Sequence, residues 1–252
     1  MKRAISALAL GLALAACATP APAPRTSTDY AALLAAPTRP DADKADDAAR
    51  KPAEVLAFMN IQPGQTILEL EAGGGYYTEL LAGAVGTTGH VIMQSPPEFK
   101  PNPARLEGNR LPNVKAMTSH FDALGDVATG SVDKVVWILG PHELYYQPKV
   151  NNVPTSLGDV TKSYAEIARV LKPGGEFIAM DHAAAAGAPT TTGGTTHRID
   201  PAVVMKQATA AGLKFVDKST ALANPQDDHT KVVYDPSLRR HTDQFLFRFK
   251  KG

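Results

Sequence analysis

The chain has 252 residues, of which 44% are hydrophobic and 20% are charged, and this composition suits one globular domain with a sizeable core. Its 26 basic and 25 acidic residues give a formal net charge of +1. The chain therefore lacks the basic footprint of nucleic-acid binding, and we expect no nucleic-acid partner. Because Cys17 is the only cysteine, a disulfide within the chain is excluded.

The first 17 residues are typical of a lipoprotein signal peptide. Lys2 and Arg3 are positive, residues 4–13 are apolar, and residues 14–17 (LAAC) match the cleavage box of bacterial lipoproteins. The apolar run is too short to span a bilayer as a stable helix. We therefore expect lipidation at Cys17 and a periplasmic location. The alternative is a buried N-terminal helix with an incidental cysteine.

The residues after Cys17 predict how the chain is held at the membrane. Ala18 resembles the residue found in lipoproteins that are sent on to the outer membrane. Loss of Lys2 and Arg3 leaves 24 basic against 25 acidic residues, so acyl chains rather than charge would hold the chain. Residues 18–28, rich in alanine and proline, predict an extended or disordered tether, and residues 29–252 predict the folded domain.

A strand, a glycine turn and a helix follow two expected helices at 29–36 and 45–59. The apolar run 67–70 predicts the strand, Gly73 to Gly75 form the turn, and residues 76–85 have helical periodicity. Glycine allows a tight turn and a close approach of the backbone to a ligand, which then faces the free N–H groups of the helix. This order is typical of the start of a nucleotide-binding α/β domain.

The remaining elements alternate in the same way. Further strands are predicted at 90–93, 114–117, 131–139, 176–180, 213–219 and 242–250, and helices at 163–171 and 201–211. Prolines predict a loop or lid at 95–109, and small polar residues predict a mobile loop at 183–196. The alternation of Phe245, Phe247 and Phe249 suits an antiparallel edge strand. We predict one Rossmann-like, doubly wound α/β sheet of about seven strands, mostly parallel with an antiparallel last strand and helices on both faces.

The order of these motifs resembles the class I S-adenosylmethionine-dependent methyltransferases over nearly all of the chain after the signal. The resemblance rests on three segments, PGQTILELEAGGG, HFDALGDVATGSVDKVVWIL and AEIARVLKPGGEFIAMDH. A narrower resemblance, to a group of predicted exported bacterial methyltransferases, rests on Arg39–Pro40, GGGYYTE, HELY at 142–145, HRID at 197–200 and Asp227–Asp228. These resemblances imply S-adenosylmethionine as the cofactor and name no acceptor.

The resemblance also implies which residues contact the cofactor. Glu69 would support the cofactor amine at the end of the first strand, and Asp122 would contact the adenine. Two positions depart from the family: Glu71 replaces the first turn glycine, and Gln94 or Ser95 replaces the acid that binds the ribose. A neutral acceptor is weaker than an ionised one, so the departures lower the expected affinity. The expected cofactor contacts are Glu69, Glu71, Gly73, Gly74, Gly75, Tyr76, Gln94 and Asp122.

Methyl transfer requires in-line placement of the acceptor and, for a protonated acceptor, a general base. His142 follows the fourth strand, and Asp181 and His182 follow the fifth, at the edge of the sheet where such folds bind ligands. Histidine has the pKa for this role near neutral pH. We therefore predict these three as catalytic residues. The alternative is a structural role for His142 and loop hydrogen bonding for Asp181 and His182.

Aromatic and basic residues near the same edge predict substrate contacts. Tyr145 and Tyr146 are expected to line a pocket, whereas Tyr77 is expected to face the core. His197 and Arg198 follow the glycine-rich loop and are expected to close over a substrate. Alternatively, Arg198 pairs with an aspartate, either Asp200 or Asp227.

Two other groups of residues have less specific patterns. Arg39, Asp46 and Arg50 could form a lid or a solvated charged face. Soft or borderline metal ligands near strand ends lack metal-ligand spacing, so no metal site is predicted. These residues are Met93, Met117, His120, Met180 and His182.

Two main functions fit the sequence. One is a lipid-anchored methyltransferase that acts on an unknown small molecule or envelope component. The other is a non-catalytic lipoprotein that keeps the fold and binds a small molecule, which the scarcity of S-adenosylmethionine outside the cytoplasm favours. A scaffold lipoprotein is a third interpretation.

Overall fold

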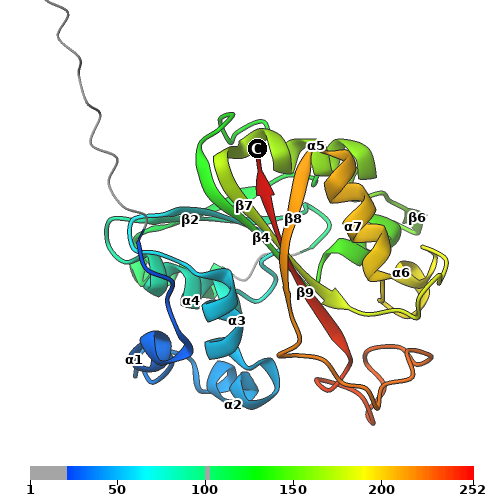
Figure 1. Cartoon of the computed structure of the whole chain (residues 1–252), viewed down its shortest axis with the longest axis horizontal. Coiled ribbons are helices and arrows are strands. Elements are labelled where there is room, and N and C mark those ends of the chain that lie inside the picture. Colours follow the sequence, from blue (N-terminus) through cyan, green and yellow to red (C-terminus); the bar gives the residue numbers. More distant parts are fainter. Residues whose placement is uncertain (1–21, 100–102) are drawn as a thin grey trace, which may run out of the picture.

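Seven strands form a central sheet with helices on both faces (Figure 1). The structure is a computed structural model that describes residues 22–99 and 103–252. The strand order is β3-β2-β1-β4-β7-β9-β8. The strands are β1 (Thr66–Leu70), β2 (His90–Ser95), β3 (Val114–Thr118), β4 (Val132–Ile138), β7 (Leu171–His182), β8 (Leu213–Ser219) and β9 (Gln244–Lys251).

The sheet confirms the predicted fold class. The pairs β1–β2, β1–β4, β2–β3 and β4–β7 are parallel, and β9 pairs antiparallel with β7 and β8. The edge position expected for the last strand is wrong, because β9 lies between β7 and β8 and β8 forms the edge. Phe245, Phe247 and Phe249 are buried, whereas most residues of β8 are exposed. A strand that is paired on both sides satisfies its backbone and can bury its side chains.

Helices precede or follow most strands, and additional short elements lie in the loops. The α-helices are α1 (Ala31–Leu34), α2 (Asp41–Arg50), α3 (Pro52–Met59), α4 (Tyr76–Val85), α5 (Val160–Val170), α6 (Thr192–Thr195) and α7 (Pro201–Ala210). The 3-10 helices are η1 (Ser27–Tyr30), η2 (Pro103–Arg105), η3 (Glu107–Asn109) and η4 (Pro141–Tyr145), and β5 (Lys149–Val150) pairs with β6 (Val153–Pro154). None of the helices in the described residues is long and apolar enough to cross a membrane.

The region predicted as one helix at 45–59 forms two helices, α2 and α3. Lys51 separates them in a left-handed conformation, with φ at 44°. Pro52 begins α3, where its missing N–H is tolerated, and it disfavours a helical conformation at the residue before it. The break lets α2 turn away from α3, as Figure 1 shows below the sheet.

Two hydrophobic clusters lie on opposite faces of the sheet. Side chains of a strand alternate between the faces, so Val135 and Trp137 belong to one cluster and Val136 belongs to the other. The first cluster includes the three phenylalanines of β9 together with residues of α5 and α7, and the second includes residues of α3 and α4. Both faces of β4 are therefore covered, which explains its nearly continuous apolar sequence.

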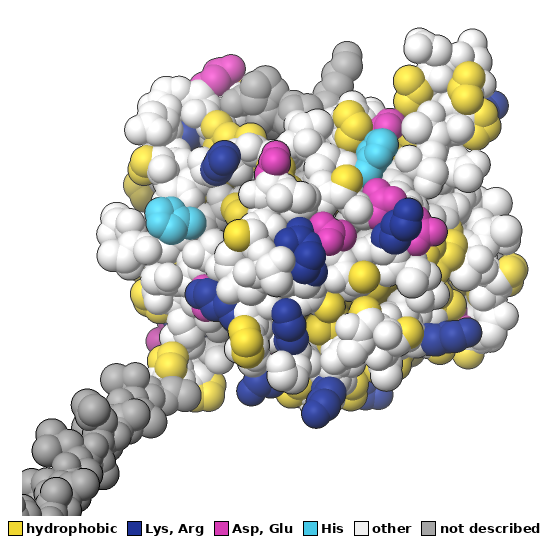
Figure 2. Space-filling view, turned by 90° about the horizontal axis from the view of Figure 1, so that it is seen from above, with side chains coloured by type: hydrophobic (Ala, Val, Ile, Leu, Met, Phe, Trp, Pro, Cys, Tyr) yellow, Lys and Arg dark blue, Asp and Glu magenta, His cyan; other side chains and the backbone are white. Residues whose placement is uncertain are grey.

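The amino-terminal segment contacts the domain earlier than expected. The guanidinium of Arg25 donates to the carbonyl oxygens of Ile61 and Ala84 and lies 4.2 Å from the centre of the Tyr30 ring. The segment predicted as a tether at 18–28 is therefore fixed to the domain from Arg25 on. The predicted signal peptide, with Cys17, lies outside the described residues. On the face shown in Figure 2, acidic and basic side chains lie together over the upper part, and Lys and Arg predominate along the lower edge.

Lys51→Gly should stabilise the domain relative to Lys51→Ala. Both changes remove the same side chain, but alanine keeps the cost of a left-handed residue, which glycine avoids. We expect the glycine variant to be more stable by about 1 kcal/mol. Chemical denaturation of the two variants measures the difference, and equal stabilities would contradict the assignment of the helix break.

Candidate functional site

A cavity of about 330 Å³ lies beside the glycine turn between β1 and α4. Gly73 and Gly74 line it, together with Glu69 and Glu71 at the end of β1. A side-chain carbon added to Gly74 would meet no atom within 4 Å. The structure thus places five of the predicted cofactor contacts around one cavity: Glu69, Glu71, Gly73, Gly74 and Tyr76.

Glu71 has a backbone conformation that suits glycine. Its φ is 52°, in the left-handed region, where a side chain is strained. Its N–H donates to the Oε1 of Gln94 at 2.9 Å, which ties the turn to the end of β2. The strain explains why a glycine is expected at this position of the fold, and strained residues of this kind cluster at functional sites.

Glu69 is a buried acid at the base of the cavity. It is 3% exposed, and its carboxyl oxygen accepts a hydrogen bond from the Thr78 hydroxyl at 2.5 Å. Burial raises the pKa of Glu69 to about 8, although the Thr78 hydrogen bond and the charge of Arg105 oppose this shift. The group is therefore protonated at neutral pH and would ionise beside a bound cation.

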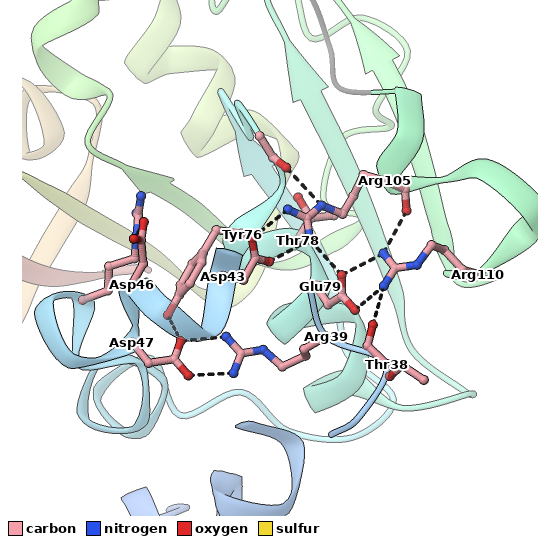
Figure 3. Close-up of polar contacts among 12 residues, drawn as sticks. Thr38, Arg39, Asp43, Asp46, Asp47, Tyr76, Thr78, Glu79, Arg105 and Arg110 are labelled. Carbon is pink, nitrogen blue, oxygen red and sulfur yellow. Dashed lines mark hydrogen bonds and ion pairs between the residues drawn. The ribbon is translucent and has the colours of Figure 1, made fainter. Parts of the chain in front are cut away.

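Buried ion pairs close the other side of the glycine turn (Figure 3). Arg105 donates to the carbonyl oxygen of Gly74 at 3.0 Å and pairs with Asp43 at 2.7 Å and Glu79 at 2.9 Å. Arg110 pairs with the second oxygen of Glu79 at 2.7 Å. The predicted loop at 95–109 therefore contributes a buried arginine that links α2 to α4 across the turn.

A second set of charges belongs to the segment predicted as either a lid or a solvated face. Arg39 is 2% exposed and donates two hydrogen bonds of 2.7 Å to Asp47. Asp47 also accepts a hydrogen bond of 2.6 Å from the Tyr76 hydroxyl. Asp46 is buried and pairs with Arg240 at 2.7 Å. A solvated face is therefore wrong for Arg39 and Asp46.

We call α2 and residues 220–243 the roof, because both segments contribute residues to the cavities at this edge of the sheet.

A second cavity, of about 200 Å³, lies under the roof next to the first. Both cavities are lined by Arg50, Tyr77 and Leu139. Tyr77 is buried as predicted, but its hydroxyl group has no hydrogen-bond partner among the described residues. A buried hydroxyl without a partner is costly, so this group marks a position where a ligand could supply the missing hydrogen bond.

His142 is fixed by Asp181 at the carboxyl end of β7. Asp181 is fully buried and accepts from the backbone N–H of His142 at 2.7 Å and from its Nδ1 at 2.9 Å. The backbone N–H of His182 donates to the same carboxylate at 2.8 Å. These contacts direct Nε2 of His142 away from Asp181 and toward the neighbouring loop.

Glu143 and His197 meet His142 on this free side. Nε2 of His142 lies 3.2 Å from Oε1 of Glu143 and 3.3 Å from Nδ1 of His197. The His197 ring also contacts the rings of Tyr146 and Tyr234, with centres 5.1 Å apart in each case. Residues 183–196 were predicted to form a mobile loop, but they contain the short helix α6. Gly193 of this helix packs closely against the carbonyl oxygen of His142.

The three histidines of this edge have different charges. Burial by itself would lower the pKa of His142. The negative charges and hydrogen bonds of Asp181 and Glu143 have a larger effect and raise this pKa to about 10. Burial, together with the charge on His142, lowers the pKa of His197. Burial lowers the pKa of His182 to about 4. At neutral pH His142 is therefore charged and cannot accept a proton, whereas His182 and His197 are neutral.

Solved structures with the same architecture come from several organisms. A SAM-dependent methyltransferase from Aquifex aeolicus matches with a TM-score of 0.58 and 18% identity, over 84% of this chain and 97% of that one. The fold is that of the S-adenosylmethionine-dependent methyltransferases. Such an enzyme from Mesorhizobium loti matches with a TM-score of 0.55 and 15% identity, over 82% and 99%. An arsenic(III) S-adenosylmethionine methyltransferase from Chlamydomonas reinhardtii matches with a TM-score of 0.50 and 17% identity. The match covers 75% of this chain and 64% of that one. No protein-family model and no curated protein match the chain.

Two residues that were predicted to contact the cofactor or the substrate instead bind other groups of the chain. Gln94 is fully buried, and its amide group is occupied by the backbones of Glu71 and Ser119, so the ribose contact expected for it is wrong. Arg198 is also fully buried and pairs with Asp227 at 2.9 Å. The substrate contact expected for Arg198 is therefore wrong, and the alternative ion pair is confirmed.

Two of the remaining cofactor predictions also have partners within the chain. The Asp122 carboxylate accepts a hydrogen bond of 2.9 Å from the backbone N–H of Asp159, the residue before α5. Gly75 lies in the turn, but the side chain of Arg105 covers it. Neither residue lines the cavity at the glycine turn.

The last two predicted residues lie apart from each other. Tyr145 lines a separate small hollow with residues of η4 and the loop before α6. His182 lines the second cavity, and its Nδ1 lies 2.6 Å from the hydroxyl oxygen of Thr242, just before β9. The loop hydrogen bonding that was the alternative for His182 is therefore present in the structure.

Sequence reasoning missed Glu143, Arg105 and Tyr234. Glu143 had a signal, because it follows His142 directly at the end of a predicted strand. Arg105 lies among prolines and Tyr234 lies in a long loop, and neither position has a periodic pattern that would place its side chain. Only the folded chain brings them to the site.

Glu69→Gln should reduce the pH dependence of stability. Between pH 4.5 and 8 the unfolded carboxyl group ionises while the folded one stays protonated, so the wild type loses stability as the pH rises. Glutamine does not titrate, and the variant should gain roughly 1 kcal/mol per pH unit relative to the wild type across this range. Denaturation at several pH values measures the gain. Exposed Glu54→Gln is the control, and parallel profiles for all three proteins would contradict the burial of Glu69.

Proposed function

We propose that the chain is an S-adenosylmethionine-dependent methyltransferase that is lipid-anchored in the bacterial envelope. The single observation that carries the proposal is the cavity at the glycine turn, where Gly74 leaves open space and Glu69 lies buried at the end of β1. The methyltransferase fold of the chain supports the choice of cofactor, and the sequence of residues 1–17 supports the anchor.

The residues around the first cavity fit part of such a cofactor. Glu69 would hold the amine, because a buried carboxyl group gains from a cation that replaces its lost hydration. The Tyr77 hydroxyl offers an unused hydrogen bond between the two cavities. The ribose fit is weaker, because Gln94 is occupied by the backbone. When bound, S-adenosylmethionine supplies a methyl group on a positively charged sulfur.

The second cavity is the place that we propose for the acceptor. It adjoins the first through Arg50, Tyr77 and Leu139, and Tyr234 connects it to His197. His197 lies next to this cavity, since its ring contacts the Tyr234 ring that lines it. His142 would hold His197 in place through the contact of 3.3 Å.

A non-catalytic binding lipoprotein is the second candidate function. Two observations favour it. The amide of Gln94 is hydrogen-bonded to the backbone, and Arg105 lies across the glycine turn and donates to the carbonyl oxygen of Gly74. Both features reduce the contacts that the turn offers to a nucleoside. In this case the chain would bind a smaller ligand in the same cavity without group transfer.

Gly74→Leu should block the first cavity without unfolding the protein. Gly74 has open space and no left-handed backbone, so the larger side chain fits the fold but fills the ligand space. Calorimetry of the full-length chain with S-adenosylmethionine and S-adenosylhomocysteine should show binding to the wild type and a loss of about tenfold or more in the variant. Gly125→Leu, in an exposed loop with equal space, is the matched control. No heat with the wild type at high micromolar ligand would refute the methyltransferase proposal, and binding without methylated product would favour the second candidate.

Cys17→Ala should release the protein from membranes. Without the thiol no acyl chain can be attached, and the rest of the chain has too little charge for membrane binding. The expected results are loss of labelling by radioactive palmitate and a shift to the soluble fraction. Retention of the variant in the membrane fraction would contradict the anchor.

A further inference from the structure

We propose that His142, Glu143 and His197 bind a divalent transition-metal ion, for which we take Zn²⁺ as the probe. The three side chains come from η4 and from the loop between α6 and α7. Within residues 22–99 and 103–252, they form a group whose ligand atoms all lie within 4.8 Å of one another. The proposal does not depend on methyl transfer.

The distances among the three ligand atoms fit one ion. Nε2 of His142 lies 3.2 Å from Oε1 of Glu143 and 3.3 Å from Nδ1 of His197, and the third side of the triangle is 4.0 Å. Ligands about 2.1 Å from a tetrahedral zinc ion lie about 3.4 Å from each other. A small rotation of the His197 ring, which is 17% exposed, would shorten the long side.

The Glu143 carboxylate gives an independent sign of a missing ligand. Glu143 is 7% exposed, and its Oε2 is buried without a hydrogen-bond partner among the described residues. Buried carboxylate oxygens normally have donors, because removing them from water is costly. A metal ion at the centre of the triangle would replace the proton on Nε2 of His142, and its double charge would lie close to both oxygens of this carboxylate.

Asp181 prepares His142 for this role. Its carboxylate accepts from Nδ1 of His142 at 2.9 Å, which leaves Nε2 as the nitrogen that can bind an ion. Metal-binding histidines usually have such a carboxylate or carbonyl on the other nitrogen. His197 is placed by the chain itself, with a left-handed φ of 54°. The fold thus fixes two imidazoles and one carboxylate at one point.

The donor set determines the class of ion. Two imidazole nitrogens and one carboxylate oxygen suit Zn²⁺, Fe²⁺ and similar ions, whereas Mg²⁺ and Ca²⁺ prefer oxygen ligands. Three protein ligands leave at least one position open for water or for a bound molecule. The alternative to an ion is a proton on Nε2 of His142 that Glu143 and His197 share.

Metal binding can be measured on the full-length chain purified in detergent. After treatment with a chelator and dialysis against Zn²⁺, elemental analysis should find one equivalent of zinc per chain. Co²⁺ in its place should give the visible absorption of a low-coordinate nitrogen and oxygen site. Glu143→Gln and His197→Asn each remove one ligand and should each lower zinc affinity by at least about 100-fold, more than the loss typical of a change beside a ligand.

His120→Asn is the matched control, because His120 pairs with Glu98 at 2.8 Å but belongs to no such group of three among the described residues. This variant should bind zinc like the wild type. Asp181→Asn should weaken binding by about 10- to 100-fold. Circular dichroism confirms that each variant is folded. The proposal is refuted if the folded wild type binds less than a stoichiometric amount, or if Glu143→Gln and His197→Asn both retain its affinity. These outcomes do not depend on S-adenosylmethionine binding, so the two proposals fail separately.

Discussion

The hydrogen bonds of Asp181 are the constraint on which the site depends. One fully buried carboxylate receives two backbone N–H groups and the His142 ring, and so joins the end of β7 to η4. Removal of this carboxylate would leave the buried imidazole of His142 without its main partner. Because His197 and Glu143 are arranged around the other nitrogen of that ring, the position of Asp181 determines what the whole edge can bind.

The glycine turn is surrounded by more charge than its sequence suggests. Arg105 connects Asp43 of α2 with Glu79 of α4, and Glu69 and Glu71 lie on the cavity side of the turn. Buried ion pairs contribute little net stability, but they require a defined arrangement of the segments that carry them. The α2 part of the roof is therefore held in one orientation by charges, and the cavity is lined by buried carboxyl groups that would ionise beside a cationic ligand.

The sequence was sufficient to predict the order of strands and helices, because alternation of apolar runs and turns is a local signal. It also placed His142, Asp181 and His182 at one edge, since parallel strands end together. It could not predict Arg105 over the turn or the partner of Arg198, which depend on loops that meet only in the folded chain. The break at Lys51 had a local signal in Pro52, which the helical periodicity around it concealed.

The place of β9 determines when the domain can form. This strand comes last in the chain order of the sheet and ends at Lys251, yet it lies between β7 and β8 and supplies three phenylalanines to the core. Until β9 has been synthesised, β7 lacks a neighbour on one side and β8 has none. The domain therefore completes its sheet only after β9 has left the ribosome, and any process that acts on the chain before that point meets an incompletely folded domain.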